Sequence, residues 1–148
     1  MTSRTDSASV ALMAFELHPQ LEAGCDELGR LGGCRLLLKN NAIFPWLLLV
    51  PEVDGIEDLH QLPATQYDEV MATVRRVSEF VAAYFQPEKL NVACIGNVVR
   101  QMHLHIVGRS ADDPAWPATV WGFDGKKPYS DEEKHKIRSA ARSFLGLP

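Results

Sequence analysis

The feature that most restricts the fold of this chain is a nearly unbroken apolar run, Trp46 to Val50, which is closed by Pro51. Apolarity at almost every position of a short run indicates a strand that is buried on both faces. A second run, Cys34 to Leu38, precedes it across a polar break that contains Asn40 and Asn41. The two runs therefore predict consecutive antiparallel strands, the second of them in the centre of a sheet.

Two amphipathic helices are predicted downstream of these strands. The longer one begins at Thr65, where Asp68 completes a capping-box pattern, and Pro87 stops it. The other begins with a capping box, Ser130 to Glu133, and ends near Gly146. Apolar residues recur in both at the spacing that forms one face of a helix lying on a sheet. They are Tyr67, Val70, Met71, Val74, Val77, Val81 and Tyr84 in the longer helix, and Ile137, Ala141, Phe144 and Leu145 in the other.

Three further elements complete the prediction. A helix is expected from Gln20 to Leu28, stopped by Gly29 and the Gly32-Gly33 pair, and two strands are expected from Leu90 to Ile95 and from Met102 to Val107. The resulting order of elements predicts an α+β fold on an antiparallel sheet. Residues 1–148 are expected to form one domain, in which 1–10 are flexible and 110–148 form a C-terminal tail and helix.

Charge and cysteine content exclude several classes of protein. Fifteen basic residues against 19 acidic ones argue against binding of nucleic acid through bulk charge. Three cysteines without a CxxC pair argue against a disulfide framework and a cysteine zinc site, and Cys94, on a predicted strand, is expected in the core. The longest apolar stretch, Ala42 to Pro51, is shorter than the roughly 20 residues that span a bilayer, and Met1 to Ser9 lacks the apolar core of a signal peptide. We therefore expect a cytoplasmic protein that binds neither membrane nor nucleic acid.

The residues with the most chemical potential lie in one predicted strand. Side chains alternate between the faces of a strand, so Gln101, His103 and His105 point one way while Met102 and Leu104 point the other. One face is therefore core, and the other carries two imidazoles and an amide.

Three interpretations of the two imidazoles are open. As zinc ligands they would need a third protein ligand, and the remaining histidines, His18, His60 and His135, are not at a recognisable ligand spacing. As structural residues they would need neighbours that satisfy their nitrogens. As a nucleophile or general base with its support, they would act beside the turn 96–98, whose backbone N–H groups can face an anion. Arg100 and Arg109 flank the pair and could add positive charge.

Residues 101–107 resemble the signature of the histidine triad (HIT) family, His-φ-His-φ-His-φ-φ with φ apolar, in which Gln101 replaces the first histidine. The strand that ends in Leu49-Val50-Pro51, the long helix after an acidic loop, and Gly96 five residues before the motif are also placed as in HIT proteins. The resemblance covers residues 34–109. It implies a five-stranded antiparallel sheet packed with a long helix and a C-terminal helix, a homodimer, and no cofactor or obligatory metal.

The same resemblance implies a function and its catalytic residues. HIT proteins are nucleotide hydrolases and transferases, and His103 matches the nucleophile that attacks the α-phosphorus of a nucleoside phosphoramidate or dinucleoside polyphosphate through a nucleotidyl-histidine intermediate. A backbone carbonyl near Gln101 would fix the tautomer of His103, and His105 would contact phosphate or orient the site. Gln101 itself cannot titrate, so a catalytically silent nucleotide-binding module is the alternative.

The binding residues follow from the same comparison. The backbone of Asn97 and Val98 matches the phosphate-binding turn, and Asn40 or Asn41 falls near the position that holds the ribose hydroxyls. Trp46 stands where many relatives have a histidine that buttresses the site. The C-terminal tail, which contains Trp116 and Trp121, is expected to be anchored on the domain or folded over the pocket.

Overall fold

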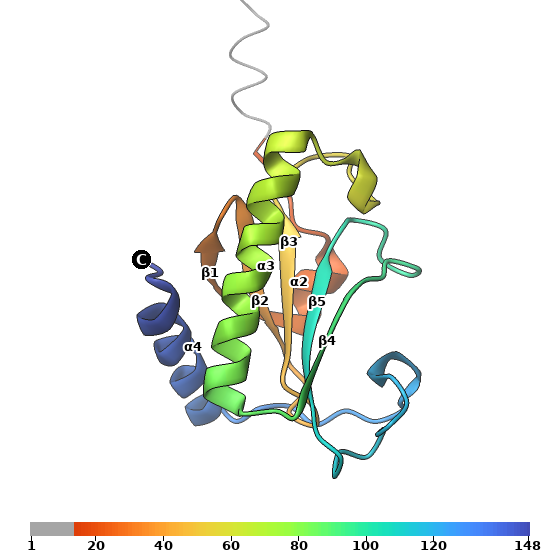
Figure 1. Ribbon diagram of the computed structural model, residues 1–148, viewed down its shortest axis with the longest axis vertical. Coiled ribbons are helices and arrows are strands. Elements are labelled where there is room, and N and C mark those ends of the chain that lie inside the picture. Colours follow the sequence, from red (N-terminus) through yellow and green to blue (C-terminus); the bar gives the residue numbers. More distant parts are fainter. Residues whose placement is uncertain (1–13) are drawn as a thin grey trace, which may run out of the picture.

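The computed structural model describes residues 14–148, so the segment 1–10 lies outside the described residues. These residues form a five-stranded antiparallel sheet in the order β1-β2-β3-β5-β4 (Figure 1). The strands are β1 (Cys25–Leu31), β2 (Cys34–Lys39), β3 (Trp46–Pro51), β4 (Lys89–Cys94) and β5 (Leu104–Arg109). The helices are α2 (Pro19–Gly24), α3 (Ala64–Phe85) and α4 (Asp131–Leu145), with short 3₁₀ turns η1 (Leu59–Gln61) and η2 (Val120–Gly122). The predicted fold class is therefore confirmed.

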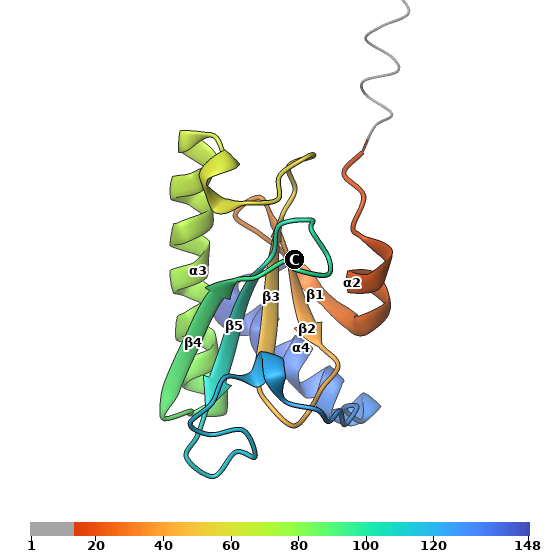
Figure 2. The same cartoon turned by 90° about the vertical axis from the view of Figure 1, so that its right-hand side faces the viewer.

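The centre of the sheet is β3, as its apolar sequence predicts. All six of its residues are buried, and it pairs with β2 on one side and with β5 on the other. One face of the sheet packs on α3 and α4, and the opposite face packs on α2 and the tail around η2 (Figure 2). Each face thus has its own apolar core.

The prediction of a helix from Gln20 to Leu28 is wrong in its second half. The helix α2 ends at Gly24, and β1 follows it and pairs with β2 through the Gly32-Gly33 turn. Both glycines have positive φ, and a Cβ on Gly32 would collide with the hydroxyl of Thr73, so this pair closes a hairpin instead of ending a helix. Pairing with a buried neighbouring strand decides the structure of a segment whose own pattern is mixed.

The long helix α3 begins differently from the prediction and ends as predicted. Its N-cap is Pro63, which makes no side-chain cap bond, so the predicted capping box at Thr65 and Asp68 is wrong. Gln86, in the left-handed conformation, and Pro87 end the helix. The buried face consists of Val70, Thr73, Val74, Val77, Phe80 and Val81, while Tyr67, Met71 and Tyr84 of the predicted face are exposed.

The C-terminal helix α4 confirms its predicted ends. The Ser130 hydroxyl accepts from the Glu133 amide, the Glu133 carboxylate accepts from the Ser130 amide, and Gly146 ends the helix with positive φ. Ile137, Ala141 and Leu145 are buried as predicted, but Phe144 is exposed. None of the described helices is both long and apolar enough to cross a bilayer.

The two strands that precede and carry the histidine motif are shifted slightly from their predicted limits. β4 runs one residue earlier, and β5 begins at Leu104 instead of Met102. Cys94 lies at the end of β4, which is an edge strand, and its side chain is exposed, so its prediction as a core residue is wrong. All three cysteines are free, as predicted.

Candidate functional site

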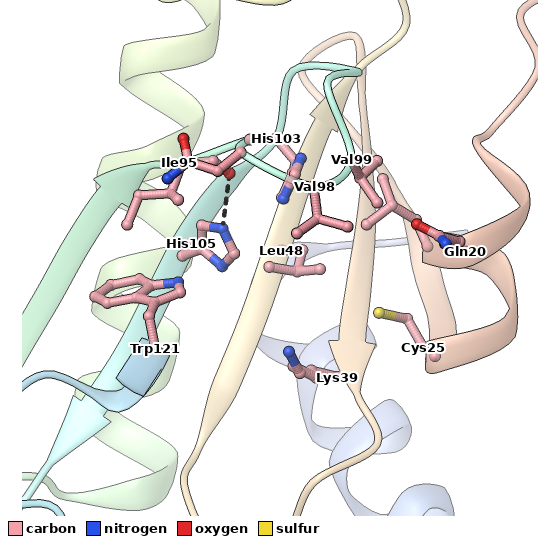
Figure 3. Close-up of a pocket in the computed structure, with 14 residues that line it drawn as sticks. Gln20, Cys25, Lys39, Leu48, Ile95, Val98, Val99, His103, His105 and Trp121 are labelled. Atoms are coloured by element: carbon pink, nitrogen blue, oxygen red, sulfur yellow. Dashed lines mark hydrogen bonds between the residues drawn. The ribbon is translucent and has the colours of Figure 1, made fainter. Parts of the chain in front are cut away.

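A cavity of about 430 Å³ lies on the face of the sheet opposite α3 (Figure 3). This volume is within the range of small-molecule sites. His103 and His105 line it, whereas Met102, Leu104 and Ile106 pack in the core against α3, which confirms the predicted alternation. The remaining walls come from α2, β2, β3, the turn before the motif and the tail. They are Gln20, Leu21, Gly24, Cys25, Lys39, Leu48, Ile95, Gly96, Asn97, Val98, Val99 and Trp121.

The tautomer of His103 follows from its hydrogen bond. Its Nδ1 lies 2.8 Å from the backbone carbonyl oxygen of Gln101. Because a carbonyl only accepts, Nδ1 carries the proton and Nε2 keeps its lone pair. Burial lowers the pKa of His103, the bond to Gln101 partly opposes this, and the charges of Lys39 and His18 lower it further. His103 is therefore neutral at neutral pH, with a nucleophilic nitrogen at the cavity.

His105 has both ring nitrogens engaged. Its Nε2 donates to the carbonyl oxygen of Ile95 at 3.2 Å, and its Nδ1 accepts from the indole N–H of Trp46 at 2.9 Å. Burial and the nearby His103 lower its pKa to about 4. The rings of His103 and His105 are 4.7 Å apart between centroids. These contacts favour the orienting role of His105 over a direct contact with phosphate.

The neutral state of both histidines makes the fold sensitive to acid. Unfolded histidine titrates near 6.5, above the folded values, so below this pH the unfolded chain binds more protons than the folded chain. Stability should therefore fall as pH falls through 6.5, and for His105 the loss should level off below about pH 4. We expect His105 alone to account for a decrease of roughly 2 kcal/mol between pH 7 and pH 5. Urea unfolding at both pH values checks this, and His105→Asn should flatten the dependence. An equal dependence in this variant would contradict the prediction.

Gln101 joins the motif to the N-terminal segment. Its side-chain oxygen accepts from the His18 amide at 2.8 Å, and its side-chain nitrogen donates to the Glu16 carbonyl at 2.9 Å. His18 is the N-cap of α2, whose Gln20 and Leu21 form one wall of the cavity. The backbone carbonyl of Gln101 thus orients the nucleophile His103. The side-chain amide of Gln101 holds the wall of the cavity that α2 forms.

Removal of the Gln101 amide should loosen that wall. Each lost hydrogen bond costs about 0.5–1.5 kcal/mol, so in Gln101→Ala the His18 amide should exchange its hydrogen about tenfold faster or more. Gln101→Glu keeps an acceptor for His18 and should retain most of the protection. Hydrogen exchange followed by NMR measures both, and unchanged exchange in Gln101→Ala would show that the wall is held by other contacts.

The turn between β4 and the motif forms one end of the cavity. Gly96, Asn97 and Val98 line it, and Val98 is 84% exposed. A Cβ on Gly96 would lie 2.8 Å from the Val99 carbonyl oxygen, so this turn requires glycine. The structure thus brings together four predicted site residues, His103, His105, Asn97 and Val98.

Asn40 and Asn41 have other partners. The side-chain oxygen of Asn40 accepts from the Tyr129 amide at 2.9 Å, and that of Asn41 accepts from the Ile43 and Lys127 amides, each at 3.2 Å. Neither asparagine is among the lining residues of the cavity. Both hold the tail on the end of β2, and their ribose contact stays a prediction.

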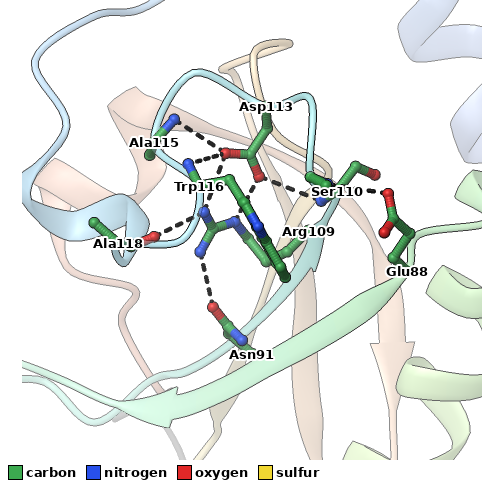
Figure 4. A network of polar contacts seen from close by, with 9 residues as sticks. Glu88, Asn91, Arg109, Ser110, Asp113, Ala115, Trp116 and Ala118 are labelled. Carbon is green, nitrogen blue, oxygen red and sulfur yellow. Dashed lines mark hydrogen bonds and ion pairs between the residues drawn. The ribbon is translucent and has the colours of Figure 1, made fainter.

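The two arginines that flank the histidine motif in the sequence bind acidic partners outside the cavity. Arg100 pairs with Glu57 at 2.7 Å. Arg109 is 2% exposed and binds the Asp113 carboxylate through two nitrogens, at 2.7 and 3.1 Å (Figure 4). It also donates to Asn91 and to the Ala118 carbonyl oxygen. The prediction that these arginines add charge to the site is therefore wrong, because each has an acidic partner.

Two further residues complete the cavity. Lys39 was not predicted from the sequence, whereas Trp121 lies over the pocket, as one of the two expectations for the C-terminal tail has it. Lys39 lines the cavity, with its Nζ 4.0 Å from the centroid of the Trp46 ring. Trp121 folds over it from the tail, 5.3 Å from the His105 ring and 5.8 Å from the Trp46 ring. Trp116 instead lies over Arg109. Within residues 14–148, no group of three or more His, Cys, Asp or Glu side chains is arranged to hold a metal ion.

Comparisons with known proteins agree with these features. The model of the HIT domain matches residues 20–112. The chain is similar to the solved structure of a histidine triad protein from Marinobacter aquaeolei VT8, with 37% identity, a TM-score of 0.86, and coverage of 90% of this chain and 97% of that one. Histidine triad proteins from Bradyrhizobium japonicum and Sinorhizobium meliloti 1021 are also similar. Their identities are 33% and 32%, their TM-scores 0.87 and 0.86, and they cover 89% and 88% of this chain and 98% and 97% of their own. No curated protein was found to match the sequence.

Proposed function

The chain belongs to the histidine triad family, and from this premise we propose that it is a nucleotide hydrolase or transferase that cleaves at the α-phosphate of a nucleoside phosphoramidate or dinucleoside polyphosphate. The family implies nucleotide binding or hydrolase and transferase activity. The observation that carries the finer proposal is the bond from His103 Nδ1 to the Gln101 carbonyl, which leaves Nε2 free at the cavity. The backbone of the turn 96–98 lies at the same cavity and is suited to an anion.

In the proposed reaction, His103 Nε2 attacks the α-phosphorus, the bond from phosphorus to the leaving nitrogen or oxygen breaks, and the leaving group takes a proton from solvent. The nucleotidyl-histidine carries a positive charge on its ring, and the Gln101 carbonyl stabilises the Nδ1 proton. Water then attacks phosphorus and loses a proton to solvent, the bond from phosphorus to Nε2 breaks with its electron pair on Nε2, and the nucleoside monophosphate is released. His105, fixed by Trp46 and Ile95, holds its ring beside that of His103 throughout.

The test of this proposal is incubation of the protein with a fluorogenic adenosine phosphoramidate. We expect release of AMP and of the fluorescent amine. Absence of turnover across phosphoramidates and dinucleoside polyphosphates would reject the catalytic proposal.

One observation favours the second candidate, a nucleotide-binding module without turnover. Both nitrogens of His105 have protein partners, and the Gln101 side chain is used to hold the N-terminal segment. Because His103 Nε2 is itself the nucleophile, no nitrogen of the motif is then free to protonate a leaving group. Calorimetry with AMP and GMP, run in parallel with the assay, separates the candidates, because a silent module binds at micromolar concentration without turnover.

The proposal includes a homodimer with a continuous ten-stranded sheet. The strand order leaves β4 at an edge, and Val92 on it is 45% exposed. Light scattering should give about twice the chain mass of 16.5 kDa, and a value near the single mass would reject the dimer. A cytoplasmic location and the absence of nucleic-acid binding stay predictions from the cysteine content and the net charge of -4.

A further inference from the structure

The cavity contains a positive charge that the proposed reaction does not use. Lys39, the last residue of β2, is half-buried and is the one acidic or basic side chain, apart from the two neutral imidazoles, among the lining residues that the structure describes. Figure 3 shows its amino group directed into the cavity. It shares the sheet face of Leu37, Leu48 and the two histidines.

The environment of Lys39 supplies no counter-charge. Within residues 14–148 its amino group makes no ion pair, and its close contact is the face of Trp46, 4.0 Å away, a favourable but modest cation–π interaction. Burial lowers the pKa of Lys39, the neighbouring Cys25 thiol partly opposes this, and the nearby charge of Lys126 lowers the pKa further. A half-buried ammonium without a carboxylate costs free energy that an anionic ligand would recover.

Strand register shows where this charge lies relative to the nucleophile. His105 pairs with Leu48, and Trp46 pairs with Val107. Because Leu38 pairs with Leu47, Lys39 is next in register to Trp46 and lies at the level of Val107. This level is four residues beyond His103, or roughly 13 Å along the strands. The turn 96–99, which joins the other end of β5, is at the His103 end of the cavity.

The cavity therefore has His103 and the turn 96–99 at one end and the ammonium of Lys39 at the other, with His105 between them. The backbone levels of Lys39 and His103 are roughly 13 Å apart along the strands, and the flexible lysine side chain spans part of this distance. A phosphate on the sugar of a nucleotide, separated by the ribose from the 5′-phosphate, suits this spacing.

We propose that Lys39 forms a second phosphate subsite, so that the protein selects nucleoside bisphosphates with one phosphate at His103 and the turn 96–99 and the other, on the ribose, at Lys39. This inference rests on the proposed function for the identity of the first group. Trp46 holds the lysine in place and, through its N–H, also fixes His105. The subsite and His105 thus share one positioning side chain.

Calorimetry with non-reacting nucleotides tests the subsite. The ligands are AMP, ADP, adenosine 3′,5′-bisphosphate and adenosine 2′,5′-bisphosphate, at one ionic strength and pH 7.5. We expect at least one ribose bisphosphate to bind at least tenfold more tightly than AMP, and more tightly than ADP. Lys39→Met, which keeps an unbranched side chain on Trp46, should bind the bisphosphate like AMP, while its affinity for AMP changes less than threefold.

Two variants control for charge and chemistry. Lys126→Met removes an equal charge at an exposed residue outside the lining and should keep the preference, and Lys39→Arg should keep most of it. Thermal unfolding verifies that each variant is folded. A preference that is absent from the wild type, or that survives in Lys39→Met, overturns the subsite and leaves the proposed function standing.

A further titration distinguishes failure of the Lys39 subsite from failure of the proposed function. If no nucleotide binds, pyrophosphate is titrated into the wild type and Lys39→Met. Binding by the wild type alone would retain an anion site at Lys39 while rejecting the proposed function. Equal or absent binding of pyrophosphate would reject both.

Discussion

Replacement of His103 by asparagine should lower kcat for an adenosine phosphoramidate by roughly 10⁴-fold or more, which is the scale of loss when a nucleophile is removed. Among the lining residues that the structure describes, His105 and Cys25 are unsuited to replace it as the nucleophile. Both nitrogens of His105 are bonded, and burial raises the pKa of the Cys25 thiol to about 11, so this thiol is protonated at neutral pH. Steady-state kinetics measures the loss, and mass spectrometry of quenched reactions should detect a nucleotidyl adduct in the wild type alone.

The matched control is His60→Asn, at an exposed histidine outside the cavity, which should leave kcat unchanged. Calorimetry with AMP should show that His103→Asn still binds, because the turn 96–99 and α2 stay in place. Substantial turnover by His103→Asn would reject covalent catalysis at this residue and favour direct attack by water.

Replacement of Arg109 by methionine should destabilise the fold by about 3–5 kcal/mol, because it breaks a buried ion pair by removing one partner. The Asp113 carboxylate, whose pKa is lowered mainly by its hydrogen bond to Arg109, would lose its cation. Asn91 and the carbonyl of Ala118 would lose their donor, and the rings of Phe44 and Trp116 would lose the guanidinium between them. Urea unfolding at pH 7 measures the change.

Arg100→Met provides the comparison for this stability prediction. Arg100 pairs with Glu57 at the exposed surface, where ion pairs contribute little, so its loss should leave the unfolding midpoint nearly unchanged. Arg109→Lys should recover part of the stability, since one ammonium cannot reach all the partners of the planar guanidinium. Equal unfolding midpoints for Arg100→Met and Arg109→Met would show that the buried network makes no net contribution to the stability of the fold.

The parts of the fold that were predictable have a strong local signal. β3 is apolar throughout, and α4 carries both members of a capping box. β1 was missed because its segment has no clear alternation and becomes a strand through pairing with β2. The start of α3 was misplaced because a proline, without any side-chain cap, precedes its first turn.

The same distinction applies to the candidate site. Alternation along one strand was sufficient to place His103 and His105 on one face, and the glycine turn identified Asn97 and Val98. The contacts that complete the site join residues far apart in sequence. Trp46 donates to His105 across 59 positions, and Asn40 accepts from Tyr129 across 89. A single sequence contains no local pattern for such pairs, which is why Lys39 and the partners of the asparagines emerged only from the fold.

The arrangement of tryptophans around His105 allows ligand binding to be followed by intrinsic fluorescence. Trp121 lines the cavity and Trp46 donates a hydrogen bond to the imidazole, whereas Trp116 lies apart over Arg109. Indole emission responds to nearby charge and polarity, so two of the three chromophores report on whatever enters the cavity and on the protonation of His105. Replacing Trp116 by phenylalanine would remove the background signal and leave an emission spectrum that follows ligand binding in real time, without a label.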